Sequence, residues 1–192
     1  MTAASGVLHK EYHEEEWSKT GGEFQMVQLW VNLPKKDKMS PPKYQAIKSG
    51  DIKRVELPNN AGTIEVIAGE YEGKKGPAST FSPVNMMNAK LKTGGKANFT
   101  FPAHYNTVAL AIEGSFIVNG TEKVETDHLA LLDNDGESFE IEATENSVIL
   151  ILSGEPLNEP IAAQGPFVMN TQMEIMEAIN DYNQGKFGYL ED

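Results

Sequence analysis

The sequence contains no cysteine, and basic residues are scarce in it. The first absence excludes disulfides, thiolate nucleophiles and cysteine-ligated zinc sites, and it leaves the redox compartment open. There are 16 Lys and Arg against 28 Asp and Glu, which gives a formal net charge of −12. Phosphate backbones and anionic membranes are bound by clustered Lys and Arg. We therefore expect no direct nucleic-acid partner and no membrane partner.

Long hydrophobic runs are also missing. No segment reaches the roughly 18 apolar residues of a membrane-spanning helix, and Met1–Glu16 lacks the apolar core of a signal peptide. A cytoplasmic location is the default expectation. The chain nevertheless has 192 residues and is 40% hydrophobic, so it can bury a substantial core.

The stretch Ala97–Leu152 predicts the fold class. Short segments alternate apolar and polar residues, and turn-forming residues recur roughly every 8–12 residues, as in all-β sandwiches and barrels. Val148–Leu152 is a continuous apolar run that suits a buried strand. The turn signals are Gly114, Asn119-Gly120 and Asp133–Gly136. This pattern predicts a small antiparallel all-β barrel.

The first half of the sequence predicts further extended segments. Val7–His13 and Phe24–Leu33 are interpreted as strands, and the second is apolar on both faces, so it needs cover on both. Trp17–Gly22 is expected to be a loop. Three prolines in Pro34–Pro42 exclude a helix there. Short strands or hairpins are expected at Ile52–Leu57, Thr63–Ala68 and Glu70–Pro77.

One helix is predicted, at Thr171–Gln184. Thr171 and Glu174 form the T-x-x-E pattern of a capping box. Gly185 fits the position that follows a helix C-terminus. An apolar stripe at helical spacing is expected to pack against a sheet, and it consists of Ile175, Met176, Ile179 and Tyr182.

A candidate metal site lies near the start of the chain. If Val7–His13 is a strand, the side chains of His9, Glu11 and His13 share one face. A histidine and a carboxylate at i and i+2 provide half of a nitrogen and oxygen site of the non-heme iron kind. The alternative is a polar strand end that leads into the acidic cluster Glu14–Glu16. The residues alone leave both interpretations open.

Several longer motifs can be compared with known families. They are GVLHKE, QLWVNLP, DKM before PP and YQ, IAGEYEGKKGPAST, and LSGEPLNEPIAAQGPFVMNT. Together they resemble the pirin family of bicupins, over almost the whole chain. The resemblance implies a cupin-type double-stranded β-helix, or jelly roll, with one C-terminal helix. It divides the chain into residues 1–57, a partial N-terminal cupin with its linker, and residues 58–192, a complete C-terminal cupin.

The resemblance also implies a metal. Pirins hold iron with two histidines of an H-x-H-R-G motif and with the histidine and glutamate of an H-x-E motif. The second motif corresponds to His9 and Glu11, whereas the first is absent from the sequence. The chain thus resembles a pirin without the first half of its metal-binding cupin. We expect an incomplete iron site, with His13 as the candidate third ligand, and no organic cofactor.

The second barrel is expected to bind no metal. His104-Tyr105-Asn106 stands where metal-binding cupins have H-x-H. His104 is therefore predicted to be a hydrogen-bonded wall residue, and His128 is likewise predicted to be structural.

The family implies two kinds of function, so enzymatic activity stays open. We expect a non-catalytic or weakly metal-binding interaction or regulatory protein, because only two family ligands are present. The alternative is an iron-dependent quercetin 2,3-dioxygenase-like oxidoreductase whose site another subunit completes. Apolar strands centred on Phe24–Leu33 predict a homo-oligomer, and they also suit a different protein partner.

Overall fold

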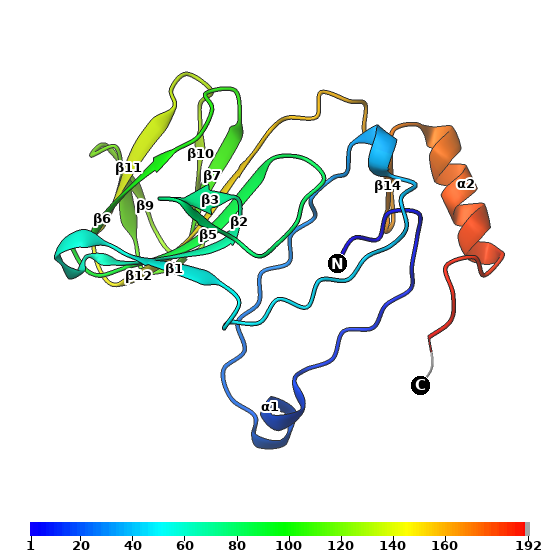
Figure 1. Ribbon diagram of the computed structural model, residues 1–192, viewed down its shortest axis with the longest axis horizontal. Coiled ribbons are helices and arrows are strands. Elements are labelled where there is room, and N and C mark those ends of the chain that lie inside the picture. Colours follow the sequence, from blue (N-terminus) through cyan, green and yellow to red (C-terminus); the bar gives the residue numbers. More distant parts are fainter. Residues whose placement is uncertain (191–192) are drawn as a thin grey trace. The chain divides into compact units, whose positions relative to one another are not determined.

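The computed structural model describes residues 1–190, and most of its regular secondary structure is antiparallel strand (Figure 1). The chain divides into two compact units. One unit combines Met1–Tyr44 with Asn158–Asp192, and the other is Gln45–Leu157. We call them the terminal unit and the barrel unit.

The barrel unit is built from two sheets with the strand orders β1-β2-β5-β12-β7-β10 and β6-β11-β8-β9. A small hairpin, β3–β4, and the 3₁₀ turn Pro58–Asn60 complete the unit. The strands are β1 (Lys53–Glu56), β2 (Gly62–Ala68), β3 (Glu70–Tyr71), β4 (Lys74–Lys75), β5 (Val84–Leu91), β6 (Lys96–Thr100), β7 (Asn106–Glu113), β8 (Phe116–Val118), β9 (Glu122–Val124), β10 (Leu129–Leu132), β11 (Ser138–Ala143) and β12 (Ser147–Gly154).

The core lies between the two sheets, and it follows the alternation of the sequence. On β11, Phe139 and Ile141 are buried, and they stand opposite Phe99 and Ala97 of β6. The rings of Phe99 and Phe139 stack at 5.3 Å. Strand β12 pairs with β5 on one side and β7 on the other. The predicted antiparallel barrel is therefore confirmed.

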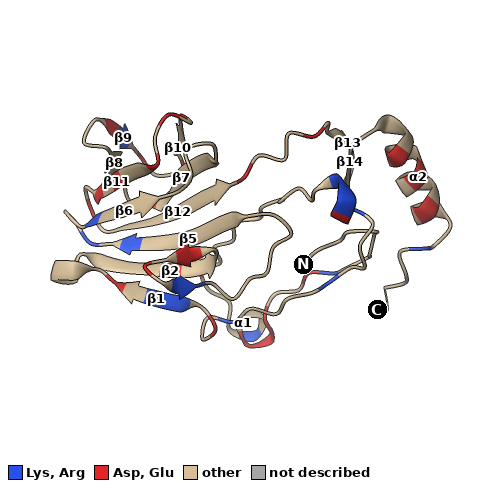
Figure 2. Cartoon of the chain, turned by 45° about the horizontal axis from the view of Figure 1, so that its top comes forward, with Lys and Arg blue, Asp and Glu red and all other residues tan. Residues whose placement is uncertain are grey.

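Strand β1 forms one edge of the larger sheet, and its side chains are mostly charged (Figure 2). Lys53, Arg54 and Glu56 are exposed. Charged side chains on an edge strand discourage pairing with another chain. This edge is thus protected by its sequence.

The terminal unit contains α1 (Glu15–Thr20), a 3₁₀ turn (Lys35–Asp37), β13 (Ala162–Gln164), β14 (Phe167–Met169) and α2 (Gln172–Asn183). The predicted capping box of α2 is confirmed. The Glu174 amide donates a hydrogen bond to Thr171 Oγ1 at 3.2 Å, and the Thr171 amide donates one to Glu174 Oε2 at 2.8 Å. Gly185 follows α2 with φ +73°. Among the described residues no helix is long and apolar enough to cross a membrane.

Several predictions for the terminal unit were wrong. Val7–His13 and Phe24–Leu33 form no strand in the described chain, because no neighbouring strand pairs with them. The predicted loop Trp17–Gly22 begins inside α1, since the Glu14 carboxylate caps the Trp17 amide at 2.8 Å. Pro34 precedes a 3₁₀ turn, where its missing N–H costs no hydrogen bond.

The apolar stripe of α2 is only partly buried. Ile175 is fully buried, and α2 packs on the β13–β14 hairpin. Met176 and Tyr182, however, are 64% and 51% exposed. The prediction that the whole stripe packs against a sheet was wrong, because a sheet of only two short strands covers little of a helix of 12 residues.

Candidate metal centre

His9 and Glu11 lie side by side in an extended segment, as their spacing predicts. His9 Nδ1 is 4.0 Å from Glu11 Oε1, and the side chains are 45% and 65% exposed. Alternation along an extended backbone turns residues two apart to one side. The structure therefore brings the two predicted ligands together, and their role as metal ligands stays a prediction.

His13 has other neighbours. Its ring stacks on Phe24 at 4.7 Å with an interplanar angle of 14°, and it lies 4.7 Å from the ring of Trp17. Helix α1 brings Trp17 into this cluster, and the amide of Trp17 lowers the pKa of the Glu14 carboxyl that caps the helix. The imidazole of His13 is thus engaged in an aromatic cluster. The spacing of these residues does not indicate the cluster, because Trp17 is expected in a loop and lies in helix α1 instead.

The donor set around His9 does not fit a tightly held transition metal by itself. Within residues 1–190, no group of three or more His, Asp or Glu side chains is arranged to hold a metal ion. Ferrous sites of the two-histidine, one-carboxylate kind need three protein donors. The described residues supply two.

His104 lies outside the barrel interior. Its side chain is 64% exposed, its Nε2 lies 3.9 Å from Glu155 Oε1, and its ring meets Tyr105 edge-on at 4.9 Å. The prediction of a hydrogen-bonded wall residue was therefore wrong, because the turn before β7 directs this side chain to solvent. An exposed His–Glu pair results.

In the described part of the chain, the buried interior positions next to the β6–β7 turn carry no His, Asp or Glu side chain. Phe101, Thr107 and Phe139 are buried there, and Thr107 Oγ1 bonds to Ser153 Oγ at 2.9 Å. Thr107 and Ser153 are direct register partners on β7 and β12. Strict alternation along these strands is the sequence signal that identifies the interior residues.

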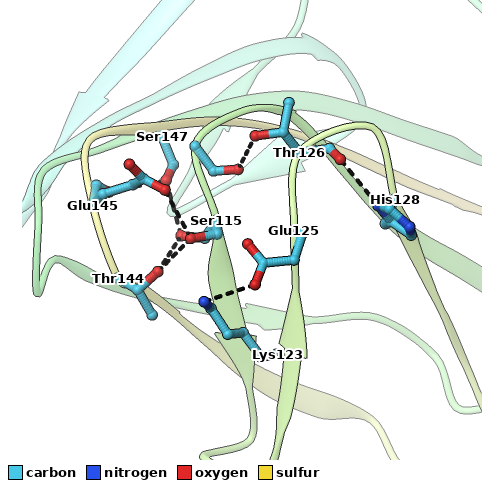
Figure 3. Close-up of polar contacts among 9 residues, drawn as sticks. Ser115, Lys123, Glu125, Thr126, His128, Thr144, Glu145 and Ser147 are labelled. Carbon is cyan, nitrogen blue, oxygen red and sulfur yellow. Dashed lines mark hydrogen bonds and ion pairs between the residues drawn. The ribbon is translucent and has the colours of Figure 1, made fainter.

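A hydroxyl cluster at the turns of the barrel is structural (Figure 3). Ser115 Oγ lies 2.6 Å from Thr144 Oγ1 and donates to Glu145 Oε1 at 2.9 Å, while Ser147 Oγ donates to the Ser115 carbonyl at 3.0 Å. His128 contacts the Thr126 carbonyl instead, at 3.0 Å. The cluster joins two turns. A serine nucleophile needs an imidazole base beside its hydroxyl. Among the described residues, Ser115 is bonded to a carboxylate and a hydroxyl instead, and His128 is bonded elsewhere.

Two buried charges also hold the fold together. Glu65 bonds to Arg54 and Lys90, each at 3.0 Å. Burial opposes its ionisation, but these hydrogen bonds hold the pKa of Glu65 below its usual value.

In the terminal unit, the Lys38 ammonium donates to Asn32 Oδ1 and to the Val168 carbonyl, and burial lowers the pKa of Lys38.

Comparison with known proteins decides the family. The family model described as the pirin C-terminal cupin domain matches residues 86–188. This chain belongs to the pirin family. Its fold is accordingly an all-β cupin with a C-terminal helix, as its motifs implied.

Named relatives of this pirin include enzymes as well as pirins. A Pseudomonas aeruginosa protein, whose name marks it as a candidate quercetin 2,3-dioxygenase, is 48% identical over 187 residues, which are 97% of this chain and 65% of the relative. Human pirin is 36% identical over 195 residues, 98% of this chain and 64% of its own length. A crystal structure of a quercetin 2,3-dioxygenase from Acinetobacter baumannii shares 49% identity with a TM-score of 0.94, over 98% of this chain and 66% of that one. The chain thus spans somewhat less than two thirds of these relatives.

Proposed function

We propose that this chain acts by binding rather than by catalysis. Its proposed role is that of a weakly metal-binding interaction or regulatory protein. The observation that supports this best is the engagement of His13 with Trp17 and Phe24, which leaves His9 and Glu11 as a two-donor pair. Water would have to supply the remaining donors of a ferrous ion held by this pair. Two exposed donors hold such an ion weakly.

We propose that the interaction surface of this pirin is the apolar segment that precedes the 3₁₀ turn. Six large apolar side chains within eight residues are 38–66% exposed, and contiguous exposure of this kind is typical of interaction sites. The proposed occupant is a second copy of the chain, and a different protein is the alternative that a mixed-partner experiment would reveal. The six are Phe24, Met26, Val27, Leu29, Trp30 and Val31.

A second candidate function is that of an iron-dependent quercetin 2,3-dioxygenase-like enzyme. The named relatives at 48% and 49% identity favour it. It requires further ligands from another subunit, beside the His9–Glu11 pair, and a pocket that excludes water. In such a site the iron would supply the oxygen chemistry, and the protein residues would hold and orient it.

Quercetin turnover separates the two candidates. The chain is loaded anaerobically with ferrous ion, mixed with quercetin and oxygen, and assayed over a wide range of protein concentration. The binding proposal expects no turnover above that of free iron. Turnover that rises faster than linearly with protein concentration, and that His9→Ala or Glu11→Gln abolishes while His104→Ala does not, would establish the second candidate instead.

A further inference from the structure

A cavity of about 280 Å³ opens at one end of the barrel unit. It is formed by the end of β6, the β8–β9 turn, β10 and the β10–β11 turn. Its apolar wall consists of Phe101, Val118, Leu132 and Phe139. Barrel mouths with an apolar wall and a few polar groups are common ligand sites.

Two buried phenylalanine rings form part of the wall. Phe101 and Phe139 are 8% and 6% exposed, and their ring centroids lie 6.2 Å apart with a tilt of 44°. Tyr105 adds a third ring to the lining. The cavity volume equals that of about nine water molecules in the liquid, so it suits a ligand of roughly ten heavy atoms.

The charged residues that line this cavity are all acidic. Four carboxylates line it, and none of them makes an ion pair with a Lys or Arg in the part of the chain that the structure describes. The lining contains no Lys or Arg. A low-dielectric mouth with uncompensated carboxylates concentrates cations and repels anions. The four are Glu122, Asp133, Asp135 and Glu137.

We propose that this cavity binds a small aromatic amine in its cationic form. The ring of the ligand packs against Phe101 and Phe139, which removes apolar surface from water. The ammonium lies at the rim near Asp133 and Asp135, whose carboxylates attract it. The cavity lies within the barrel unit and uses neither His9 nor Glu11, so this proposal does not rest on the proposed function.

Binding of tyramine and of 4-hydroxyphenylacetate tests this proposal. The two probes are nearly the same size and carry opposite charges. Titration of the ¹⁵N-labelled full chain is expected to show saturable amide shifts with tyramine, centred on residues 119–122 and 133–139. We expect 4-hydroxyphenylacetate to bind at least about tenfold more weakly. Equal binding of the two probes, or shifts centred elsewhere, would overturn the proposal.

Variants locate the site within the same titration. Asp133→Asn with Asp135→Asn is expected to weaken tyramine binding about fivefold or more, because two rim charges are removed without a change of shape. Thr121→Trp places a large ring at the mouth and is expected to abolish binding. Glu177→Gln, on the exposed side of α2, is the matched control and is expected to change nothing. Tyramine binding that survives both cavity variants contradicts the proposal, and amide spectra of the variants verify that they are folded.

Discussion

His9 Nδ1 lies 4.0 Å from Glu11 Oε1, in an exposed segment of the terminal unit. A second exposed pair has almost the same separation, because His104 Nε2 lies 3.9 Å from Glu155 Oε1 in the barrel unit. Distance and exposure therefore do not distinguish the pairs. The resemblance of His9-Lys10-Glu11 to the H-x-E motif of the pirin family does, and on this ground His9 and Glu11 are the proposed metal ligands.

The first prediction compares these two pairs. His9→Ala is expected to lower the affinity for Fe²⁺ or Ni²⁺ about tenfold, since it removes one of two protein donors. His104→Ala is expected to leave the affinity unchanged. Competition with a fluorescent chelator under anaerobic conditions measures both constants. A larger loss in His104→Ala than in His9→Ala would assign the metal to the barrel unit.

The second prediction concerns alkaline pH. Burial, assisted by Glu72, raises the pKa of Tyr71 to about 12, from a reference value of 10.0. The folded state then keeps this phenol protonated at a pH where the unfolded chain has lost the proton. The contribution to stability is complete below pH 10 and is lost as the pH rises towards 12, by roughly 2–3 kcal/mol.

Urea unfolding across this range measures the effect. Tyr71→Phe is expected to flatten the decline in the free energy of unfolding between pH 10 and pH 12. Tyr189→Phe is the control, because Tyr189 is 91% exposed. If the wild type and Tyr71→Phe decline in parallel, Tyr71 does not titrate as the structure indicates.

The third prediction addresses the hydroxyl cluster. Ser115 is 2% exposed and bonds to both Thr144 and Glu145. Ser115→Ala is expected to lower the free energy of unfolding by about 1–3 kcal/mol, because it removes the hydrogen bonds of the buried Ser115 hydroxyl to half-buried Thr144 and to exposed Glu145, each of which contributes roughly 0.5–1.5 kcal/mol. Chemical denaturation measures this, with Ser138→Ala, at an exposed position of β11, as the control. Equal stability of the two variants would show that the cluster contributes nothing specific.

The fourth prediction tests the apolar segment. Trp30 and Val27 are 66% and 43% exposed. Val27→Lys with Trp30→Ser is expected to shift the chain from a self-associated to a monomeric species in sedimentation velocity. Met173→Lys, which changes an exposed apolar residue on α2, is expected to leave association unchanged. A wild-type chain that is monomeric at all concentrations would contradict self-association, and a larger species that forms only with another protein would indicate the different partner.

The barrel and α2 were predictable because their signals are local. Alternation on β11 places Phe139 and Ile141 inside, and Thr171 with Glu174 defines the start of α2. Phe24–Leu33 shows the limit of such reasoning. It has the composition of a strand, but strand formation depends on a distant partner that the segment itself does not specify.

The candidate site was predictable only in part, for the same reason. The i, i+2 spacing alone brings His9 to Glu11. The position of His13 depends on α1, which begins because Glu14 caps the amide of Trp17. A loop at Trp17–Gly22 would not bring Trp17 to His13, so the ring cluster of His13, Trp17 and Phe24 does not follow from the sequence pattern.

Anaerobic titration of the purified chain with Fe²⁺, followed by desalting and elemental analysis, measures how tightly His9 and Glu11 hold iron. If His9 and Glu11 act as a two-donor pair, the dissociation constant lies above about 10 µM and the desalted chain retains little iron. One equivalent of iron that stays bound through desalting, and that is lost in His9→Ala, would show instead that the chain holds iron tightly at a more complete site.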